Sequence, residues 1–523
     1  VHKRLLETDT VLGTALVDMY AKCGALAKAR EVLEKLPVRN VVSWSVLITG
    51  YAQMEIGQNA LECFERMGSE GLYPDAIILT SVLNACASIL AIEKGKQIHT
   101  KILSNCLLEK DILLGNALVD MYAKCAMLEK AKRVLKDLPY RDTITWSALI
   151  AGYAEQGLCH EALICFEHMQ SEGLSPDVVT YMSILKACGI TRAIDEGMLM
   201  HENIKSTGLL VKNNVLGNAL VDMYAKCGVL ARARDVFEEI YNRDVVTWNT
   251  IMTGYVQHGQ DSEALDCFER IQLEGLSLDS ITFISILKAC ANTRSIDKGI
   301  RIHEKIVSRH LLEKDFALGK ALVDMYAKCG RFQKAQKVLE ELPLRDVVSW
   351  NMIITGYVQH GQYRNALNCF EQMQNEGVSA DEITFLCVLK ACINSRDLDK
   401  GKQIHQNVVR KKYLDKDVVL GNALVDLYAK CGVLEIAQQV VDELPIRDVA
   451  TWNTLITAYC QQRHDAQAFE CFRRMQVEGI LPDAVTILCI LKACACIGAI
   501  EEGKQVHDQI MDKGFLCKNI VLG

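Results

Sequence analysis

The 523-residue sequence lacks most of the patterns that mark membrane proteins, metal sites and sheet proteins. It has only seven prolines and 6% aromatic residues, and no stretch approaches the ~18 uninterrupted apolar residues of a membrane helix. No Cys-x-x-Cys pair occurs among its 22 cysteines, and no alternation of apolar and polar residues is long enough to predict a sheet. The formal charge of -7 does not favour a general basic binder of nucleic acid. We therefore expect no membrane segment, no metal and no cofactor.

What the sequence does contain is a long tandem repeat. Near-copies of the segment 112–142 start at residues 10, 214, 316 and 418, each 102 residues after the one before. Every period divides into units of 31, 35 and 36 residues, so residues 10–519 hold fifteen complete units. Residues 1–9 then end a preceding 36-residue unit and residues 520–523 begin another 31-residue unit. We interpret the chain as part of a longer array.

Apolar residues recur with helical spacing in every unit. In segment 112–142, Ala117, Leu118 and Met121 belong to one apolar stripe, and a second stripe follows a break near Met127. Other copies have glycine at that break, which suits a helix C-terminus, and all seven prolines fall at unit ends. The pattern predicts an all-α protein: a right-handed α-solenoid superhelix of two-helix units, each packing only on its neighbours.

Cysteine, tryptophan and histidine also follow the period. Because free cysteine behaves as a small apolar residue, we expect fifteen of the cysteines to be reduced and buried. They are Cys23, Cys125, Cys227, Cys329 and Cys431; Cys63, Cys165, Cys267, Cys369 and Cys471; and Cys86, Cys188, Cys290, Cys392 and Cys494. Core packing is the favoured interpretation of Trp44, Trp146, Trp248, Trp350 and Trp452. Histidines spaced one period apart cannot converge on a metal, so a structural role is favoured for His99, His201, His303, His405 and His507.

A 35-residue helical hairpin that opens Val-Val-Thr-Trp-Asn and closes Gly-Leu-Ser-Leu-Asp, as in 245–279, resembles the pentatricopeptide repeat. Further matching phrases are Gly-Asn-Ala-Leu-Val-Asp-Met-Tyr-Ala-Lys-Cys-Gly (217–228), Arg-Asp-Val-Val-Ser-Trp-Asn (345–351) and Leu-Lys-Ala-Cys (389–392). The alternation of unit lengths resembles the plant PLS subclass, with S, P and L units of 31, 35 and 36 residues. The resemblance implies sequence-specific binding of single-stranded RNA, one nucleotide per repeat, for C-to-U editing or RNA processing in a mitochondrion or chloroplast.

The resemblance also implies that the fifth and the last residue of a repeat contact the base. Asp only accepts hydrogen bonds and suits the imino N–H of uracil or guanine, whereas Asn also donates and suits adenine or cytosine. At the fifth position, Ser or Thr leaves room for a purine and Asn favours a pyrimidine. The pairs of the 31- and 35-residue units are Thr14 with Asn40, Ser45 with Asp75, Asn116 with Asp142, Ser147 with Asp177, Asn218 with Asp244, Asn249 with Asp279, Lys320 with Asp346, Asn351 with Asp381, Asn422 with Asp448, and Asn453 with Asp483.

Taken in order with the RNA parallel to the chain, these pairs predict the site 5′-AGnUGnUUnnUnUUn-3′. The nucleotide at the Lys320 unit is left open because lysine departs from the pattern. The 36-residue units have Thr80, Met182, Ile284, Leu386 and Leu488 at the fifth position, mostly apolar groups that cannot read a base edge, so each receives an unread nucleotide.

Each of these assignments has a structural alternative. Asp or Asn at a unit boundary is also a common helix N-cap. A further set of lysines could contact phosphates or only solvate a helix end: Lys22, Lys124, Lys226, Lys328 and Lys430. The second residues of the 35-residue units could sandwich bases, as the resemblance suggests, or pack in the core: Val42, Ile144, Val246, Val348 and Ala450.

Three functions are compatible with the sequence. The first is RNA recognition, with editing factors or a deaminase acting in trans. The second is a helical scaffold that binds proteins, which the acidic balance favours. The third is the recognition part of an editing deaminase whose catalytic domain lies beyond residue 523. The deaminase signature, His-x-Glu with a later Cys-x-x-Cys, does not occur in these 523 residues, so we expect the chain itself not to be an enzyme.

Overall fold

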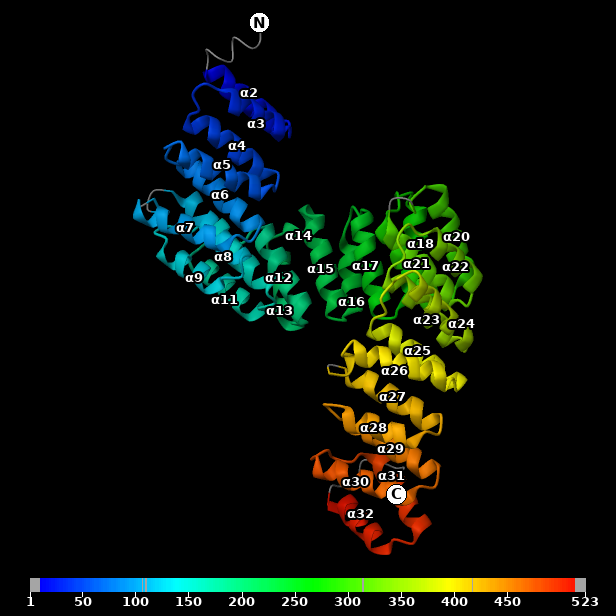
Figure 1. Cartoon of the computed structure of the whole chain (residues 1–523). Coiled ribbons are helices and arrows are strands. Elements are labelled where there is room, and N and C mark those ends of the chain that lie inside the picture. The colour runs from blue at the N-terminus through cyan, green and yellow to red at the C-terminus, as the bar shows by residue number, and fades with distance from the viewer. Residues whose placement is uncertain (1–9, 106, 109–110, 313–314, 416, 513–523) are drawn as a thin grey trace. The chain divides into compact units, whose positions relative to one another are not determined.

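The computed structural model describes residues 10–512, apart from 106, 109–110, 313–314 and 416 (Figure 1). The predicted partial units, 1–9 and 520–523, lie outside the described residues. The described part of the chain is helical and contains no strand, and its tandem units supply thirty helices. This confirms the predicted all-α solenoid of two-helix repeats.

Each unit contributes a first and a second helix. In the 31-residue units the first helices are α2 (Thr10–Lys22), α8 (Ile112–Lys124), α15 (Asn214–Lys226), α21 (Phe316–Lys328) and α27 (Val418–Lys430). Their second helices are α3 (Leu26–Lys35), α9 (Leu128–Asp137), α16 (Leu230–Glu239), α22 (Phe332–Glu341) and α28 (Leu434–Glu443).

In the 35-residue units the first helices are α4 (Val41–Gln53), α10 (Thr143–Glu155), α17 (Val245–Gln257), α23 (Val347–Gln359) and α29 (Val449–Gln461). The second helices are α5 (Gly57–Ser69), α11 (Cys159–Ser171), α18 (Asp261–Leu273), α24 (Tyr363–Asn375) and α30 (Asp465–Val477).

In the 36-residue units the first helices are α6 (Ala76–Ser88), α12 (Val178–Thr191), α19 (Ser280–Asn292), α25 (Glu382–Ser395) and α31 (Ala484–Ile497). The second helices are α7 (Ile92–Ser104), α13 (Ile194–Ser206), α20 (Ile296–Ser308), α26 (Leu398–Arg410) and α32 (Ile500–Asp512). A short helix α14 (Leu209–Lys212) and a 3-10 turn η1 (Tyr413–Asp415) lie in two of the connections.

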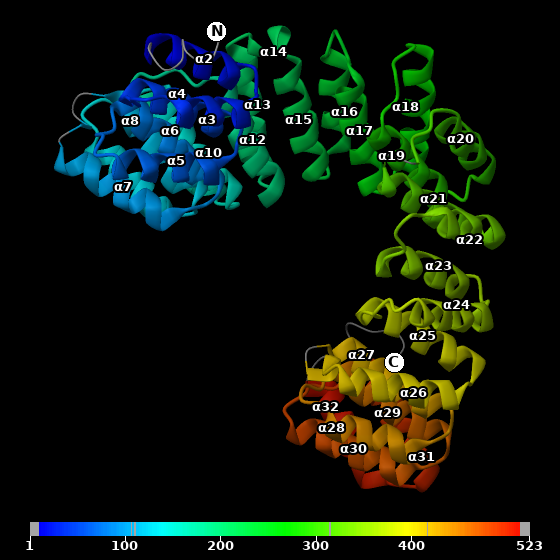
Figure 2. The same cartoon turned by 45° about the horizontal axis from the view of Figure 1, so that its top comes forward.

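The chain forms two compact units, residues 1–260 with 271–276 and residues 261–270 with 277–523. Within each, every first helix packs on the first helix of the next repeat, as α8 does on α6 and α10, and α25 on α23 and α27. The second helices pack behind this layer (Figure 2). The first helices therefore form one continuous layer in each compact unit, and a residue at a given place on them recurs from repeat to repeat.

Close approach of first helices depends on small residues at their contact. A Cβ atom built on Gly152 of α10 would lie 2.7 Å from the Cβ of Ala123 on α8, closer than two carbon atoms can pack. Gly157 follows α10 with φ near +69°, a left-handed conformation that glycine adopts without strain. These positions explain why glycine stands inside and just after the helix.

The periodic tryptophans are buried, with at most 6% of any side chain exposed. Four of them donate the indole N–H to a glutamate near the end of the second helix, for example Trp146 to Glu172 at 2.8 Å. Four of the five histidines bond the hydroxyl of a tyrosine in the next repeat, for example His201 Nδ1 to Tyr224 at 2.9 Å. Core tryptophan is confirmed, and so is a structural role for these four histidines; His507 is exposed on α32.

The cysteine prediction holds for ten positions and is wrong for five. The ten in 35- and 36-residue units are buried, and burial raises the pKa of the Cys165 thiol to about 11. In the 31-residue units Cys125, Cys227, Cys329 and Cys431 are only half-buried and Cys23 is exposed. The reason is that these five directly follow the last residue of the first helix, where the chain turns at the surface of the layer.

Candidate nucleic-acid interface

The two residues of each predicted base-reading pair lie on consecutive first helices. The fifth residue is inside the first helix of its own unit, whereas the last residue caps the first helix of the next unit. In every pair the capping side chain accepts the backbone N–H of the third helical residue, so the N-cap interpretation is correct. These caps are Asn40, Asp75, Asp142, Asp177, Asp244, Asp279, Asp346, Asp381, Asp448 and Asp483.

Capping does not prevent these carboxylates from meeting the fifth residue. Four Asn–Asp pairs are joined by a hydrogen bond that the amide Nδ2 donates to the carboxylate. The distances are 3.1 Å for Asn116 and Asp142, 2.9 Å for Asn351 and Asp381, 3.2 Å for Asn422 and Asp448, and 2.9 Å for Asn453 and Asp483. The predicted pairing thus corresponds to direct contact in these four copies.

The other copies differ in instructive ways. The Lys320 ammonium forms an ion pair with Asp346 at 2.6 Å. Ser147 Oγ lies 3.5 Å from Asp177 Oδ1. Among the described residues no bond joins Thr14 to Asn40, Ser45 to Asp75 or Asn218 to Asp244; Thr14 donates to the carbonyl of Thr10 at 2.8 Å. Asn249 is buried on α17 and Asp279 caps α19.

The paired carboxylates are held in their ionised form. Burial alone acts to raise the pKa of Asp381, but the Thr384 backbone N–H, the Asn351 amide and the Thr384 hydroxyl all donate to it and bring the pKa below its ordinary value. The same balance lowers the pKa of Asp142, Asp448 and Asp483. At neutral pH these groups are therefore hydrogen-bond acceptors only.

The second residue of each first helix is exposed, which excludes the core-packing alternative. Val42, Ile144 and Val246 are each 58% exposed, Val348 is 46% exposed, and Ala450 is exposed too. The 31- and 36-residue units place exposed apolar residues at the same point, where sequence reasoning did not look for them: Val11, Leu113, Val215, Ala317 and Val419, and Ile77, Val179, Ile281, Ile383 and Val485. Their recurrence at the same place in every unit was the signal available.

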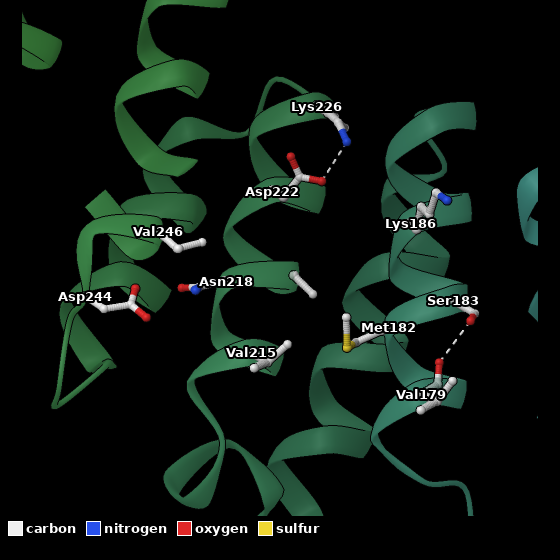
Figure 3. A pocket seen from close by; sticks show the side chains of 11 residues that line it. Val179, Met182, Ser183, Lys186, Val215, Asn218, Asp222, Lys226, Asp244 and Val246 are labelled. Atoms are coloured by element: carbon white, nitrogen blue, oxygen red, sulfur yellow. Dashed lines mark hydrogen bonds and ion pairs between the residues drawn. The ribbon is translucent and has the colours of Figure 1, made fainter. Parts of the chain in front are cut away.

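Three of these residues line an open pocket of about 650 Å³ formed by the first helices α12, α15 and α17 (Figure 3). Val179 and Val215 line it from α12 and α15, and Val246 lines it from the start of α17. Asn218 points toward the capping Asp244 at its edge, and the half-buried Met182 of the 36-residue unit lines the opposite side from α12. The pocket thus offers aliphatic walls next to an amide and a carboxylate, which suits a flat ring with a polar edge.

The five lysines of the 31-residue units each form an ion pair with the aspartate four residues earlier. Lys226 lies 2.6 Å from Asp222 on the wall of the pocket, and Lys22, Lys124, Lys328 and Lys430 repeat this bond at 2.8 to 2.9 Å. A second set of exposed lysines, on the first helices of the 36-residue units, has no ion-pair partner within the described part of the chain: Lys186, Lys288, Lys390 and Lys492. Sequence reasoning missed them, although they too recur every 102 residues.

Known proteins show the same repeat. The sequence matches the PPR repeat family at 141–189, 243–292, 345–394 and 447–496, and the PPR repeat at 14–41, 42–72, 116–142, 218–245 and 320–347. A mitochondrial pentatricopeptide repeat-containing protein of Arabidopsis thaliana is 34% identical over 97% of this chain. The chain belongs to the pentatricopeptide repeat family.

Other relatives in this family share similar identity. A chloroplastic pentatricopeptide repeat-containing protein of Arabidopsis thaliana is 34% identical over 96% of the chain, and another from that plant is 32% identical over 98%. The chain spans 66% of the mitochondrial relative's length, 57% of the chloroplastic one's and 74% of the third one's.

Among solved structures, the maize pentatricopeptide repeat protein PPR10 has the same fold. It aligns with a TM-score of 0.60 and 19% identity over 95% of this chain and 84% of that one. Its complex with an 18-nt psaJ RNA element aligns with a TM-score of 0.52 and 18% identity, over 95% and 83% of the two chains.

The described part of the chain lacks two further features. No helix there has the length and apolar character to cross a bilayer. No group of three or more His, Cys, Asp or Glu side chains is placed there to hold a metal ion.

Proposed function

We propose that this pentatricopeptide repeat chain binds single-stranded RNA in a sequence-specific manner, one nucleotide per repeat, as the specificity module for C-to-U editing or RNA processing in a mitochondrion or chloroplast. The observation that carries the proposal is the recurrent group of an exposed aliphatic residue and a polar pair on consecutive first helices. A base stacked between two such aliphatic residues brings its Watson–Crick edge to the polar pair.

The chemistry of the pair supports base selection. An ionised Asp beside an Asn amide offers an acceptor and a donor side by side, which complements the N3–H and a carbonyl oxygen of uracil. Cytosine has no proton at N3, so its lone pair would face the carboxylate. The base assignments therefore stay as the site 5′-AGnUGnUUnnUnUUn-3′, with the 36-residue units as weakly selective spacers of the PLS pattern.

The lysines are proposed to contact the RNA backbone. Lys226 and its four equivalents are already neutralised by an aspartate, which leaves Lys186, Lys288, Lys390 and Lys492 as the stronger candidates for phosphate contact. Affinity from such contacts falls with salt concentration. The proposed partners for catalysis are editing factors or a deaminase, acting in trans or from a segment outside these residues.

A randomised-RNA enrichment with the purified chain tests the proposal. We expect enriched RNAs to carry the predicted site, and Asp381→Asn to change the eleventh nucleotide from U to C because the acceptor-only side chain is replaced by one that also donates. Asp399→Asn, the same charge change in the first turn of the second helix α26, is the matched control and should leave the enriched sequence unchanged. A wild-type chain without any sequence preference would instead favour a protein-binding scaffold.

A further inference from the structure

A buried hydroxyl lies behind the predicted base-reading pairs. It belongs to the third residue of the helix that the last residue of the pair caps. In nine of the ten pairs this residue is Ser or Thr: Ser43, Thr145, Thr180, Thr247, Thr282, Ser349, Thr384, Thr451 and Thr486, all at most 1% exposed. After the 36-residue units, which are predicted to read no base, the same position is a buried leucine: Leu114, Leu216, Leu318 and Leu420.

The hydroxyl joins both members of the pair. Thr384 Oγ1 lies 2.7 Å from Asn351 Oδ1 and 2.7 Å from Asp381 Oδ1. The Asn351 amide completes the triangle by donating to Asp381. Thr451 repeats the geometry, 2.6 Å from Asn422 and 2.8 Å from Asp448, and the groups at Thr145 and Thr486 have the same three bonds.

The number of protons available in this triangle determines the orientation of the Asn351 side-chain amide. The backbone N–H of Asp381 donates to Thr384 Oγ1 at 3.2 Å, so the hydroxyl proton must point away, toward Asn351 Oδ1 and Asp381 Oδ1. The carboxylate cannot donate, and therefore Asn351 has to turn its oxygen to the hydroxyl and its nitrogen to Asp381. One N–H of the Asn351 amide is left to donate to a ligand. The amide oxygen faces the Thr384 hydroxyl and is not presented to the ligand.

We propose that those hydroxyls that bond a fifth residue are specificity-determining positioning residues: where the fifth residue is Asn, the hydroxyl holds its amide in the one orientation that presents N–H, and so enforces uracil over cytosine. The inference deepens the proposed RNA binding and rests on it. Without the hydroxyl, the amide can rotate and offer its oxygen to the exocyclic amino group of cytosine. The Asp is affected less, because its cap bond to a backbone N–H persists.

The bridging hydroxyl bond is absent from the Ser45 and Asn218 copies, as it is from the Thr14 and Lys320 copies. Ile78 replaces the hydroxyl behind Ser45 and Asp75, whereas Thr180 Oγ1 lies 2.6 Å from Ser147 in the otherwise equivalent group. In another copy Thr247 donates to Asp244 at 2.9 Å, and Asn218 Oδ1 is buried without a partner. The Asn218 oxygen thus lacks the bond to a hydroxyl that Asn351 has.

The experiment compares Thr384→Val with Thr384→Ser by randomised-RNA enrichment and by thermal unfolding. Thr384→Val should lower the preference for U over C at the eleventh nucleotide by about two- to tenfold, the range of one net hydrogen bond. All other nucleotides should keep their preferences, and Thr384→Ser should behave as wild type. Ser349→Ala is the matched control, because it removes a hydroxyl from the equivalent cap of α23, where the fifth residue, Lys320, bonds Asp346 directly and does not bond the hydroxyl.

Each outcome separates the two proposals. If wild type enriches U at the eleventh nucleotide and a folded Thr384→Val variant enriches it equally, the positioning role is wrong. If wild type has no preference at that nucleotide, the proposed function fails instead. Should Thr384→Val not fold, the wild-type profile still decides, since the second and fifth nucleotides are both predicted as G. The second nucleotide is assigned to the pair that has Ile78 in place of the hydroxyl, so the preference for G should be weaker there than at the fifth nucleotide. An equal or stronger preference for G at the second nucleotide would overturn the proposal.

Discussion

Replacing Lys320 by Asn should convert the unassigned tenth nucleotide of the site into a uracil. The Lys320 ammonium lies 2.6 Å from Asp346 Oδ2, so it neutralises a carboxylate that in the Asn–Asp pairs accepts an amide N–H. An Asn here can instead donate one N–H to Asp346, as Asn351 does to Asp381 at 2.9 Å. The pair would then offer the same donor and acceptor as its neighbours.

The exposure of the two side chains sets how much stability the substitution costs. Lys320 and Asp346 side chains are 28% and 33% exposed, so their ion pair contributes no more than about 1 kcal/mol and the variant should stay folded. Burial acts to raise the pKa of Asp346, but bonds from Ser349 persist after the substitution and oppose this, so the carboxylate should stay ionised at neutral pH. The gain in selectivity should be about 1 to 3 kcal/mol, by analogy with single mismatches at DNA sites.

The assay is equilibrium binding of four RNAs that carry the predicted site and differ only at the tenth nucleotide. Wild type should bind the four with similar affinity, and Lys320→Asn should prefer U by roughly five- to a hundredfold. Lys320→Met, which removes the ion pair without supplying an amide, is the control and should show no preference for U. Equal binding of the four RNAs by Lys320→Asn would refute the reasoning.

Three other predictions can be tested on the same chain. Asn249→Thr with Asp279→Asn should move the eighth nucleotide from U toward A in an enrichment experiment, and a change at any other nucleotide would contradict the parallel order. Val246→Ala should weaken binding of all RNAs to a similar extent without altering thermal stability, because this side chain is 58% exposed and is proposed to contact the base through its apolar surface alone. Burial lowers the pKa of His201 below its ordinary 6.5, so the unfolded chain binds protons more readily and stability falls as pH drops through about 6.5. His201→Gln should flatten that fall in a thermal unfolding series from about pH 7.5 to about 5.5, and an unchanged slope would exclude the histidine as its source.

The helices could be predicted because their signals are local. Apolar stripes, glycine turns and prolines repeat every 102 residues, and the first helix α8 begins at Ile112, where the repeated segment begins. The ion pair of Lys226 with Asp222 can be predicted from the sequence in the same way, since residues four apart share a helix face. The exposure of Cys125 cannot, because helical spacing alone does not tell whether a residue just past a helix end is covered.

The hydroxyl behind nine of the ten pairs could not be predicted from the sequence for a different reason. Thr384 lies 33 residues from Asn351 and belongs to the next repeat, so their contact depends on how closely two first helices pack. In the sequence Thr384 reads as an ordinary capping residue, which it also is. Only the packed layer shows that one side chain has two roles.

This arrangement bears on how such chains can be cut and rejoined. The fifth residue, the carboxylate and the hydroxyl of one reading group are encoded on both sides of a repeat boundary, so a 35-residue block transplanted alone would separate Asp381 from Thr384. A donor fragment should instead extend three residues into the following repeat. Duplication of a whole 102-residue period copies every such junction inside the period intact. The junctions at the two ends of the period have leucine in place of the Ser or Thr, so no hydroxyl is lost there.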